Sequence, residues 1–347
     1  MKNMSPKAEV LNERETMSRS VIAMILLFVG MIALLILISV SISLGAANID
    51  LSTVWSALFE FKKELTTHQI IRDVRIPRAL AATLIGSFLA VSGSIMQGVT
   101  RNPLASPSIM GVTAGSAFLI AIAFAFFPET SSMGLMFFSF LGAGLGAVLV
   151  FMIASFSKGP FTPVKLALAG TAISVLLSGI SSTISIYYQV AQDISFWYAG
   201  GVSGANWNSI QLMLPVALVG LGMALFLSRS ITVINCGEEV AKGLGQRIIL
   251  TKVLSIIAVL LLTGAAVSVG GTIGFIGLII PHITRFIVGV DYRWIIPCSA
   301  VLGALLLVVA DILARMIEPP YETPVGAITT IIGVPFFLYL VRSGRRG

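Results

Sequence analysis

Long apolar stretches alternate with short polar connections along the whole of this chain. A hydrocarbon core of ~30 Å is crossed by a helix of about 20 apolar residues. We expect each such run to form a membrane-spanning helix, since an outer-membrane barrel would show short alternating strands instead. The ten expected spans are residues 21–44, 79–99, 108–127, 133–156, 166–187, 210–227, 253–269, 272–289, 295–317 and 325–341.

Two of these boundaries rest on a length argument. The run 253–281 is continuous, and we divide it at Gly270-Gly271, because one straight helix of that length would overshoot the membrane. The run from Val21 to Leu44 exceeds a secretory core and no small-residue cleavage site follows it, so we interpret it as a retained span. The sequence therefore predicts a tail, residues 1–20, and one polytopic domain, residues 21–347.

Composition supports the same class of protein. Hydrophobic residues make up 56% of the 347 residues and charged residues only 11%, whereas soluble domains carry about 25% charged residues. The net charge of +7 therefore indicates cytoplasmic loops that face anionic headgroups of membrane lipid, not a nucleic-acid partner. Two cysteines are too few for a disulfide framework.

The distribution of basic residues predicts the orientation. Ten spans put both termini on one side, and we place that side in the cytoplasm because all but six of the 22 basic residues then face inward. Five of the six exceptions lie in one loop after the first span. The exceptions are Lys62, Lys63, Arg72, Arg75, Arg78 and Arg315.

Motifs for catalysis or for an internal energy source do not occur. The sequence has no G-x-x-x-x-G-K-[ST] loop for ATP and no H-E-x-x-H metal motif. The mid-membrane regions hold essentially no carboxylate for a proton relay; Asp311 is four residues from Arg315, the spacing of a helix-face ion pair. We expect no catalytic residue, cofactor or metal ligand in this chain, and an external motor if it transports.

Small residues recur at helical spacing in two of the spans, and we interpret both patterns as close helix packing. The fourth span has a G-x-x-x-G pair. The residues are Ala82, Gly86, Ala90, Ser94 and Gly98 in the second span, and Gly142 and Gly146 in the fourth.

The fifth span carries more hydroxyls than packing requires. Gly170, Ser174, Ser178 and Ser182 form one stripe at i, i+4 spacing. These hydroxyls either bond across helices or line a wetted path for a polar solute, and the pattern alone leaves both interpretations open.

The longest cytoplasmic connection, residues 228–252, predicts a short helix, a turn and a second short helix. Within it, Glu238 and Glu239 are followed by small residues and a glycine break, yet Val240, Ala241 and Leu244 are apolar. An ordinary solvated loop would be polar throughout, so we favour a docking surface. Beyond the fifth span, residues 193–209 hold aromatics that indicate either an interfacial belt or a short helix.

Several segments resemble one family. The stretches "RIPRALAATLIGSFLAVSGSIMQGVTRNPLASPSIMGVTAGSAF" (75–118), "GEEVAKGLGQ" (237–246), "GFIGLIIPHITRFIVGVDYRWIIPCSAVLGALLLVVADILARMI" (274–317) and "ETPVGAITTIIGVPFFLYLV" (322–341) are similar to the FecCD permeases of ABC importers for iron-siderophores and vitamin B12. The resemblance runs from about residue 20 to the C-terminus.

The resemblance implies an all-α membrane protein of about ten helices, with the type II ABC importer permease fold, in a bacterial cytoplasmic membrane. It implies four kinds of contact: membrane lipid, a second permease chain (identical or paralogous), two cytoplasmic ATPase subunits that hydrolyse ATP, and an extracytoplasmic binding protein.

Residue roles follow from the matching motifs. The resemblance implies that Arg75, Arg78 and Arg315 meet acidic residues of the binding protein, and we expect them to be exposed, whereas Arg72 has no implied role and could pair with Asp73 or Glu64. It also implies a region near the cytoplasmic gate at 159–165. The implied ATPase-coupling residues are Glu238, Glu239, Ala241, Gly243, Leu244 and Gly245, and those of the translocation path are Ser174, Ser178 and Ser182.

The expected cargo is an iron-siderophore, with a hydroxamate favoured over cobalamin or haem because siderophore systems are the commoner members of the family. Two alternatives come from other classes. One is a secondary carrier that binds sodium through backbone carbonyls. The other is an intramembrane enzyme with Ser94 or Ser268 as nucleophile and His282 as base, which the absence of G-x-S-x-G disfavours.

Overall fold

The computed structural model describes residues 6–45, 50–156, 163–199, 201–318 and 321–343, and within them every regular element is a helix. The elements are α1 (Pro6–Ser43), α2 (Leu51–Phe59), α3 (Thr66–Ile70), the π-helical segment Ile71–Arg75, α4 (Ile76–Thr100), the 3-10 turn Pro107–Met110, α5 (Val112–Phe126), α6 (Ser132–Phe156), α7 (Pro163–Tyr187), α8 (Ala191–Ala199), α9 (Trp207–Asn235), α10 (Glu238–Gly243), α11 (Ile248–Gly270), α12 (Ile276–Val288), α13 (Tyr292–Met316) and α14 (Val325–Ser343).

Each of the ten expected spans coincides with one helix. In the described part of the chain, seven helical stretches are long and apolar enough to cross a membrane. The other three spans correspond to shorter apolar helices, Val112–Phe126, Ile276–Val288 and Val325–Tyr339. The all-helical class is therefore confirmed, and the number of complete crossings stays a prediction.

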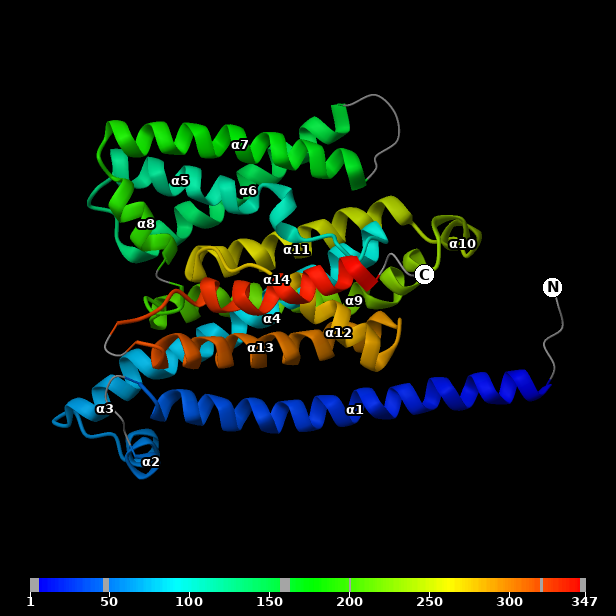
Figure 1. Ribbon diagram of the computed structural model, residues 1–347, viewed down its shortest axis with the longest axis horizontal. Helices are drawn as coiled ribbons and strands as arrows, with labels where there is room; N and C mark the ends of the chain where they lie inside the picture. The colour runs from blue at the N-terminus through cyan, green and yellow to red at the C-terminus, as the bar shows by residue number, and fades with distance from the viewer. Residues whose placement is uncertain (1–5, 46–49, 157–162, 200, 319–320, 344–347) are drawn as a thin grey trace.

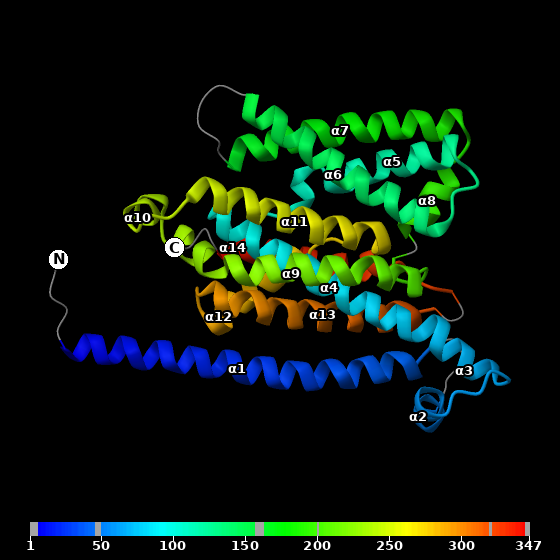
Figure 2. The same ribbon diagram turned by 180° about the vertical axis from the view of Figure 1, so that it is seen from behind.

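The long helices run side by side with α4 in the middle of the bundle (Figures 1 and 2). Helix α1 forms one edge, and α5, α6 and α7 form the opposite side. The first turn of α1, the last turn of α14 and the short helix α10 lie at one end, which we call the inner end. Helices α2, α3 and α8 lie at the other, which we call the outer end.

Glycines let the central helix touch its neighbours backbone to backbone. A methyl group on Gly86 would overlap the carbonyl oxygen of Gly303 in α13, and one on Gly93 would overlap that of Gly277 in α12. Ser94 Oγ also donates to Ser299 Oγ of α13 at 3.0 Å. The small-residue stripe of the second span thus has the packing role expected from its spacing.

The G-x-x-x-G pair of α6 serves the same purpose. A methyl group on Gly142 would overlap the carbonyl of Gly115, and one on Gly146 would overlap that of Gly111. Helices α5 and α6 are consequently in close contact along this line, which confirms the interpretation of that motif.

A sharp turn separates α11 from α12 at the expected place. Helix α11 ends at Gly270, and Gly271 has a φ of +63°, a conformation that glycine adopts without a steric penalty. Phe275, with a φ of +67°, precedes α12. The division at Gly270-Gly271 is confirmed. The segment 193–209 overlaps a short helix, α8, as one of its two interpretations required.

We expect Gly86→Ala to destabilise the bundle by about 1–3 kcal/mol, because the added methyl group has no space against Gly303. Gly144→Ala is the matched control, since Gly144 lies in the middle of α6 with open space around it. Thermal unfolding in detergent measures both. Equal melting temperatures for the two variants would contradict this account of the packing.

Candidate docking, translocation and coupling sites

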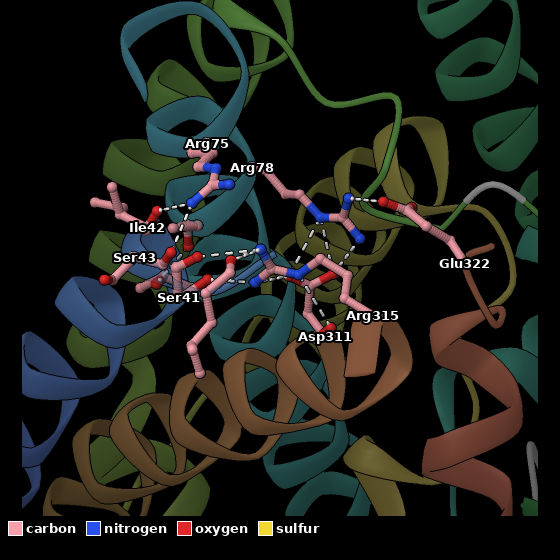
Figure 3. Close-up of polar contacts among 11 residues, drawn as sticks. Ser41, Ile42, Ser43, Arg75, Arg78, Asp311, Arg315 and Glu322 are labelled. Carbon is pink, nitrogen blue, oxygen red and sulfur yellow. Dashed lines mark hydrogen bonds and ion pairs between the residues drawn. The ribbon is translucent and has the colours of Figure 1, made fainter. Parts of the chain in front are cut away.

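Three arginines from two parts of the chain meet at the outer end of the bundle (Figure 3). Arg75 ends the π-helical segment, Arg78 lies in the first turn of α4, and Arg315 lies in the last turn of α13. Residues three apart share a helix face, so Arg75 and Arg78 both turn toward the ends of α1 and α13. We call these arginines, with Asp311 and Glu322, the arginine cluster.

Asp311 is the centre of the cluster. Its side chain is fully buried and accepts hydrogen bonds from Arg78 Nη2 at 2.8 Å and Nε at 3.0 Å. On the other side, Arg315 Nη2 lies 2.9 Å from Asp311 Oδ2. One carboxylate thus forms ion pairs with two buried guanidinium groups, which joins the N-terminus of α4 to the C-terminal part of α13.

Two of the arginines also cap the C-terminus of α1. Arg75 Nη1 donates to the carbonyl oxygens of Ile42 at 2.6 Å and Ser43 at 2.8 Å. Arg315 Nη1 donates to those of Ser41 and Leu44 at 3.1 and 3.0 Å. The last carbonyls of a helix have no partner within it and carry partial negative charge, so cations at this position stabilise the helix end.

These contacts correct one expectation. We expected exposed arginines, but Arg75, Arg78 and Arg315 are only 7%, 6% and 8% exposed. The reason is that the chain supplies their acceptors itself, from Asp311 and from the end of α1. Asp311 was recognised in the sequence only as the i, i+4 partner of Arg315, and its bond to Arg78 across the bundle could not be read from local spacing.

Glu322 is the exposed member of the cluster and was missed in the sequence. Its Oε1 accepts from Arg78 Nη1 at 2.6 Å, and its side chain is 42% exposed. The only local signal is a carboxylate in the outer connection that follows the "ADILAR" helix. Glu322 therefore occupies the part of Arg78 that is nearest to solvent.

Arg72 has a different environment. Its guanidinium carbon lies 4.6 Å from the centre of the Phe61 ring, and its carbonyl accepts from Trp207 Nε1 at 3.0 Å. Within the described residues no ion pair joins Arg72 to Asp73 or Glu64, so its contacts are aromatic.

The hydroxyl stripe of the fifth span lies on an open face of α7. Ser178 and Ser182 are exposed and Ser174 is partly exposed. The neighbouring hydroxyls of Ser181 and Ser185 donate to carbonyls of their own helix, at 2.7 and 2.6 Å. These neighbouring hydroxyls therefore give no support to hydrogen bonding between helices. The interpretation that they favour is a surface lined by hydroxyls.

The open face forms a groove of about 410 Å³. Its walls come from α7, α5 and α8, and its polar lining consists of serines. A second open groove of about 660 Å³ shares Ser195 with the first. It is lined by Thr272, which follows α11, and by residues of α14 that include Thr330. Neither groove has a charged side chain in its lining. The serines of the first groove are Ser178, Ser181, Ser182, Ser185 and Ser195.

The connection 228–252 forms a compact unit at the inner end. Gly237, with a φ of +135°, directly precedes α10, and Gly245, with a φ of +73°, lies in the turn that follows it. Both angles favour glycine, which explains two of the glycines. The expected second short helix is wrong, because after Gly245 the chain enters the long helix α11 at Ile248.

The apolar residues of this unit divide into two groups. Ala241 is fully buried against Ile234 and Ile248, so it holds α10 onto the bundle. We had expected it to face a partner, and its burial prevents direct contact. Val240 and Leu244 are exposed, Leu244 by 70%. Glu239, Gly243 and Gly245 are exposed as well.

Glu238 ties α10 to the bundle. Its Oε1 accepts from Lys252 Nζ of α11 at 2.7 Å and lies 4.0 Å from Nη2 of Arg101, the residue that follows α4. The hydrogen bond from Lys252 and the charges of Lys252 and Arg101 hold the pKa of Glu238 below its ordinary value, although partial burial opposes them. Glu238 is therefore ionised at neutral pH. The region 159–165 lies mostly outside the described residues.

Comparisons with known proteins give a consistent result. The FecCD transport family matches residues 31–343. The iron(3+)-hydroxamate import system permease protein FhuB of Bacillus subtilis is 62% identical over 330 residues, 95% of this chain and 86% of that protein. The cobalamin import system permease protein BtuC of Halobacterium salinarum is 38% identical over 295 residues, 84% and 79% of the two chains.

The fold has a solved counterpart. A structure described as an inward-facing metal-chelate type ABC transporter aligns with a TM-score of 0.80 at 31% identity, over 91% of this chain and 98% of that chain.

We expect Asp311→Asn to lower the free energy of unfolding by about 3–5 kcal/mol, because two buried guanidinium groups lose their common counter-charge. Asp73→Asn, an exposed change at the same end of the bundle, is the control. Thermal unfolding in detergent measures both variants. An Asp311→Asn protein as stable as the control would show that the cluster does not hold α4, α13 and α1 together.

Proposed function

This chain belongs to the FecCD transport family, and we propose that it is the permease subunit of an ABC importer that carries ferric hydroxamate complexes across the membrane. The observation that carries the choice of cargo is the 62% identity to an iron(3+)-hydroxamate permease across 95% of the chain, against 38% to a cobalamin permease. Cobalamin and haem remain the alternative cargoes within the same family.

The grooves are compatible with such a cargo. A siderophore already satisfies the coordination of its iron, so the path needs no metal ligand. Small hydroxyls along α7 and α8, with no fixed charge in the groove lining, hydrogen-bond weakly to a polar complex and do not trap it. We assign Ser174, Ser178 and Ser182 to this path.

The proposed topology has ten crossings with both termini in the cytoplasm of a bacterium. The excess of basic residues at the inner end supports this orientation. Helices α5, α12 and α14 complete the ten crossings in this proposal, although their apolar stretches are shorter than those of the other seven helices. A second permease chain, identical or paralogous, covers the open face of α7, where Val175 and Ile186 are exposed beside the serines.

The proposed motor is a pair of ATPase subunits at the inner end, on separate chains. Helix α10 offers them the exposed residues Glu239 and Val240, and the turn that follows it offers Leu244. Ala241 and Glu238 contribute indirectly, because they fix α10 to α9 and α11. Gly243 and Gly245 shape the turn that presents Leu244.

We place the docking of the binding protein at the outer end, through the arginine cluster. Since the arginines are buried and paired, docking by acidic residues requires an exchange of partners. Glu322 is the member that can be exchanged, because it is half-exposed and contacts only the outward side of Arg78. Asp311 stays in place, and an incoming carboxylate replaces Glu322.

We expect the permease, assembled with its own ATPase and binding protein in liposomes, to import a ferric hydroxamate in an ATP-dependent manner. Cobalamin and a ferric catecholate are the comparison cargoes. Uptake of cobalamin in preference to the hydroxamate would overturn the choice of cargo. Uptake that follows a sodium gradient and ignores ATP would overturn the importer class.

We expect Glu322→Gln to tighten binding of the loaded binding protein by about 1.5- to 5-fold, which corresponds to the loss of a competing ion pair of 0.2–1 kcal/mol. Glu318→Gln is the matched control, because Glu318 is exposed in the same outer connection. Surface plasmon resonance on the reconstituted permease measures both. Weaker binding by Glu322→Gln alone would mean that Glu322 is itself a contact, not a competitor.

A further inference from the structure

The short helix α2 presents an apolar face that the bundle does not cover. Val54 and Ala57 are buried and form a small cluster with Ile42 of α1 and Ile71. Trp55 and Phe59 point elsewhere: they are 60% and 76% exposed. Their rings stack with centroids 5.4 Å apart and an interplanar angle of 6°, so the helix carries a flat aromatic surface one turn long.

Ser56 of α2 is bound by His68 of α3. The backbone N–H of Lys62 donates to His68 Nδ1 at 3.2 Å, which leaves the proton of the ring on Nε2. That nitrogen lies 3.2 Å from Ser56 Oγ and donates to it. His68 is 2% exposed. Helix α2 is therefore held on two sides, by α1 and by α3, and its position is fixed.

The level of α2 along the membrane normal follows from its contact with Ile42. The apolar run from Val21 to Leu44 is 24 residues long, about 36 Å as a helix, against a hydrocarbon core of ~30 Å. Its last turn, which includes Ile42, must therefore lie at the boundary between acyl chains and headgroups. Helix α2 packs on that turn and lies at the same level.

The orientation of α2 agrees with this level. In both views α2 is seen nearly end-on, whereas α1 runs across the page, so α2 lies across the direction of the spanning helices (Figures 1 and 2). It lies beyond α1, on the side away from the rest of the bundle. The outward face of α1 is strongly apolar there, with Leu35 and Ile36 exposed by 60% and 58%.

We propose that α2 is a membrane-interface anchor: Trp55 and Phe59 insert among the phospholipids of the leaflet at the outer end, beside α1. Tryptophan and phenylalanine suit this boundary because their rings are large and apolar, and the indole N–H bonds to the headgroup region. The anchor continues the lipid-facing surface of α1 and fixes the outer end of that helix, including the carbonyls that Arg75 and Arg315 cap.

Apolar contact, not charge, supplies the attraction. The segment from 50 to 73 has a net charge of −1, three basic minus four acidic residues, so it gains nothing from anionic headgroups. The acidic residues are Asp50, Glu60, Glu64 and Asp73, and the basic residues are Lys62, Lys63 and Arg72. Insertion of α2 into the membrane interface should therefore be independent of the charge of the lipid.

Spin labels at two exposed positions at the outer end test the proposal. Phe59→Cys places a label on the aromatic face of α2 and Glu64→Cys places one in the polar connection between α2 and α3, each in the full permease with Cys236→Ser; Cys298 is buried and is kept. The Cys236→Ser protein without an added cysteine gives the background. The permease is reconstituted in phosphatidylcholine liposomes, with and without phosphatidylglycerol, and collisions with oxygen and with a nickel chelate are measured.

We expect the ratio of oxygen to nickel collisions to be severalfold higher at position 59 than at position 64, in both kinds of liposome. Equal access of nickel to the two labels would overturn the proposal, because the face would then lie in water. So would a label at position 59 that neither reagent reaches, since a protein partner would then cover it. A high ratio only with phosphatidylglycerol would overturn its apolar basis.

Discussion

The contact of α4 with the backbones of α12 and α13 at Gly86 and Gly93 is the constraint on which the rest of the structure depends. A side chain at either glycine would overlap a carbonyl oxygen of the partner helix, so the approach is as close as two helices allow. This fixes α4 along its length, about 37 Å for 25 residues. Both candidate protein-contact sites are attached to its ends.

At the outer end, α4 carries Arg78 to the buried Asp311 of α13. At the inner end, its last residue is followed by Arg101, which lies beside Glu238 of α10. One packed helix thus connects the arginine cluster to α10 in the connection 228–252. We propose that a displacement at one end of α4 moves the whole helix, because its packing leaves little room for local deformation. In this proposal, α4 links the docking of a binding protein to the ATPases.

Much of the fold could be predicted from the sequence because a membrane-spanning helix is specified locally. Apolar length, glycine spacing in α4 and α6, and the Gly270-Gly271 break all depend on residues near in the chain, and each was found where expected. The arginine cluster depends on contacts between segments more than two hundred residues apart, such as Arg78 with Asp311 and Glu322. No local pattern encodes these, so the sequence indicated which arginines are unusual but not that they are buried.

The burial of the three arginines gives them a structural role at the outer end of the bundle. An exposed arginine contributes only a surface ion pair, whereas these three hold α1, α4 and α13 together through buried bonds. In the same way Ala241 and Glu238 secure α10, and the exposed Leu244 and Val240 remain for a partner. Each candidate site thus has an inner set of residues that fixes the helices and an outer set that is free to contact another protein.

We propose that α10 must be tied to α4 and α11 for docking and ATP hydrolysis to be coupled. The number of ATP molecules hydrolysed per ferric complex imported tests this, measured in liposomes for the wild-type importer and for Glu238→Gln. We expect this number to rise in the variant while the ATPases remain bound, because α10 has lost its ion pair with Lys252. An unchanged number with intact assembly would contradict it.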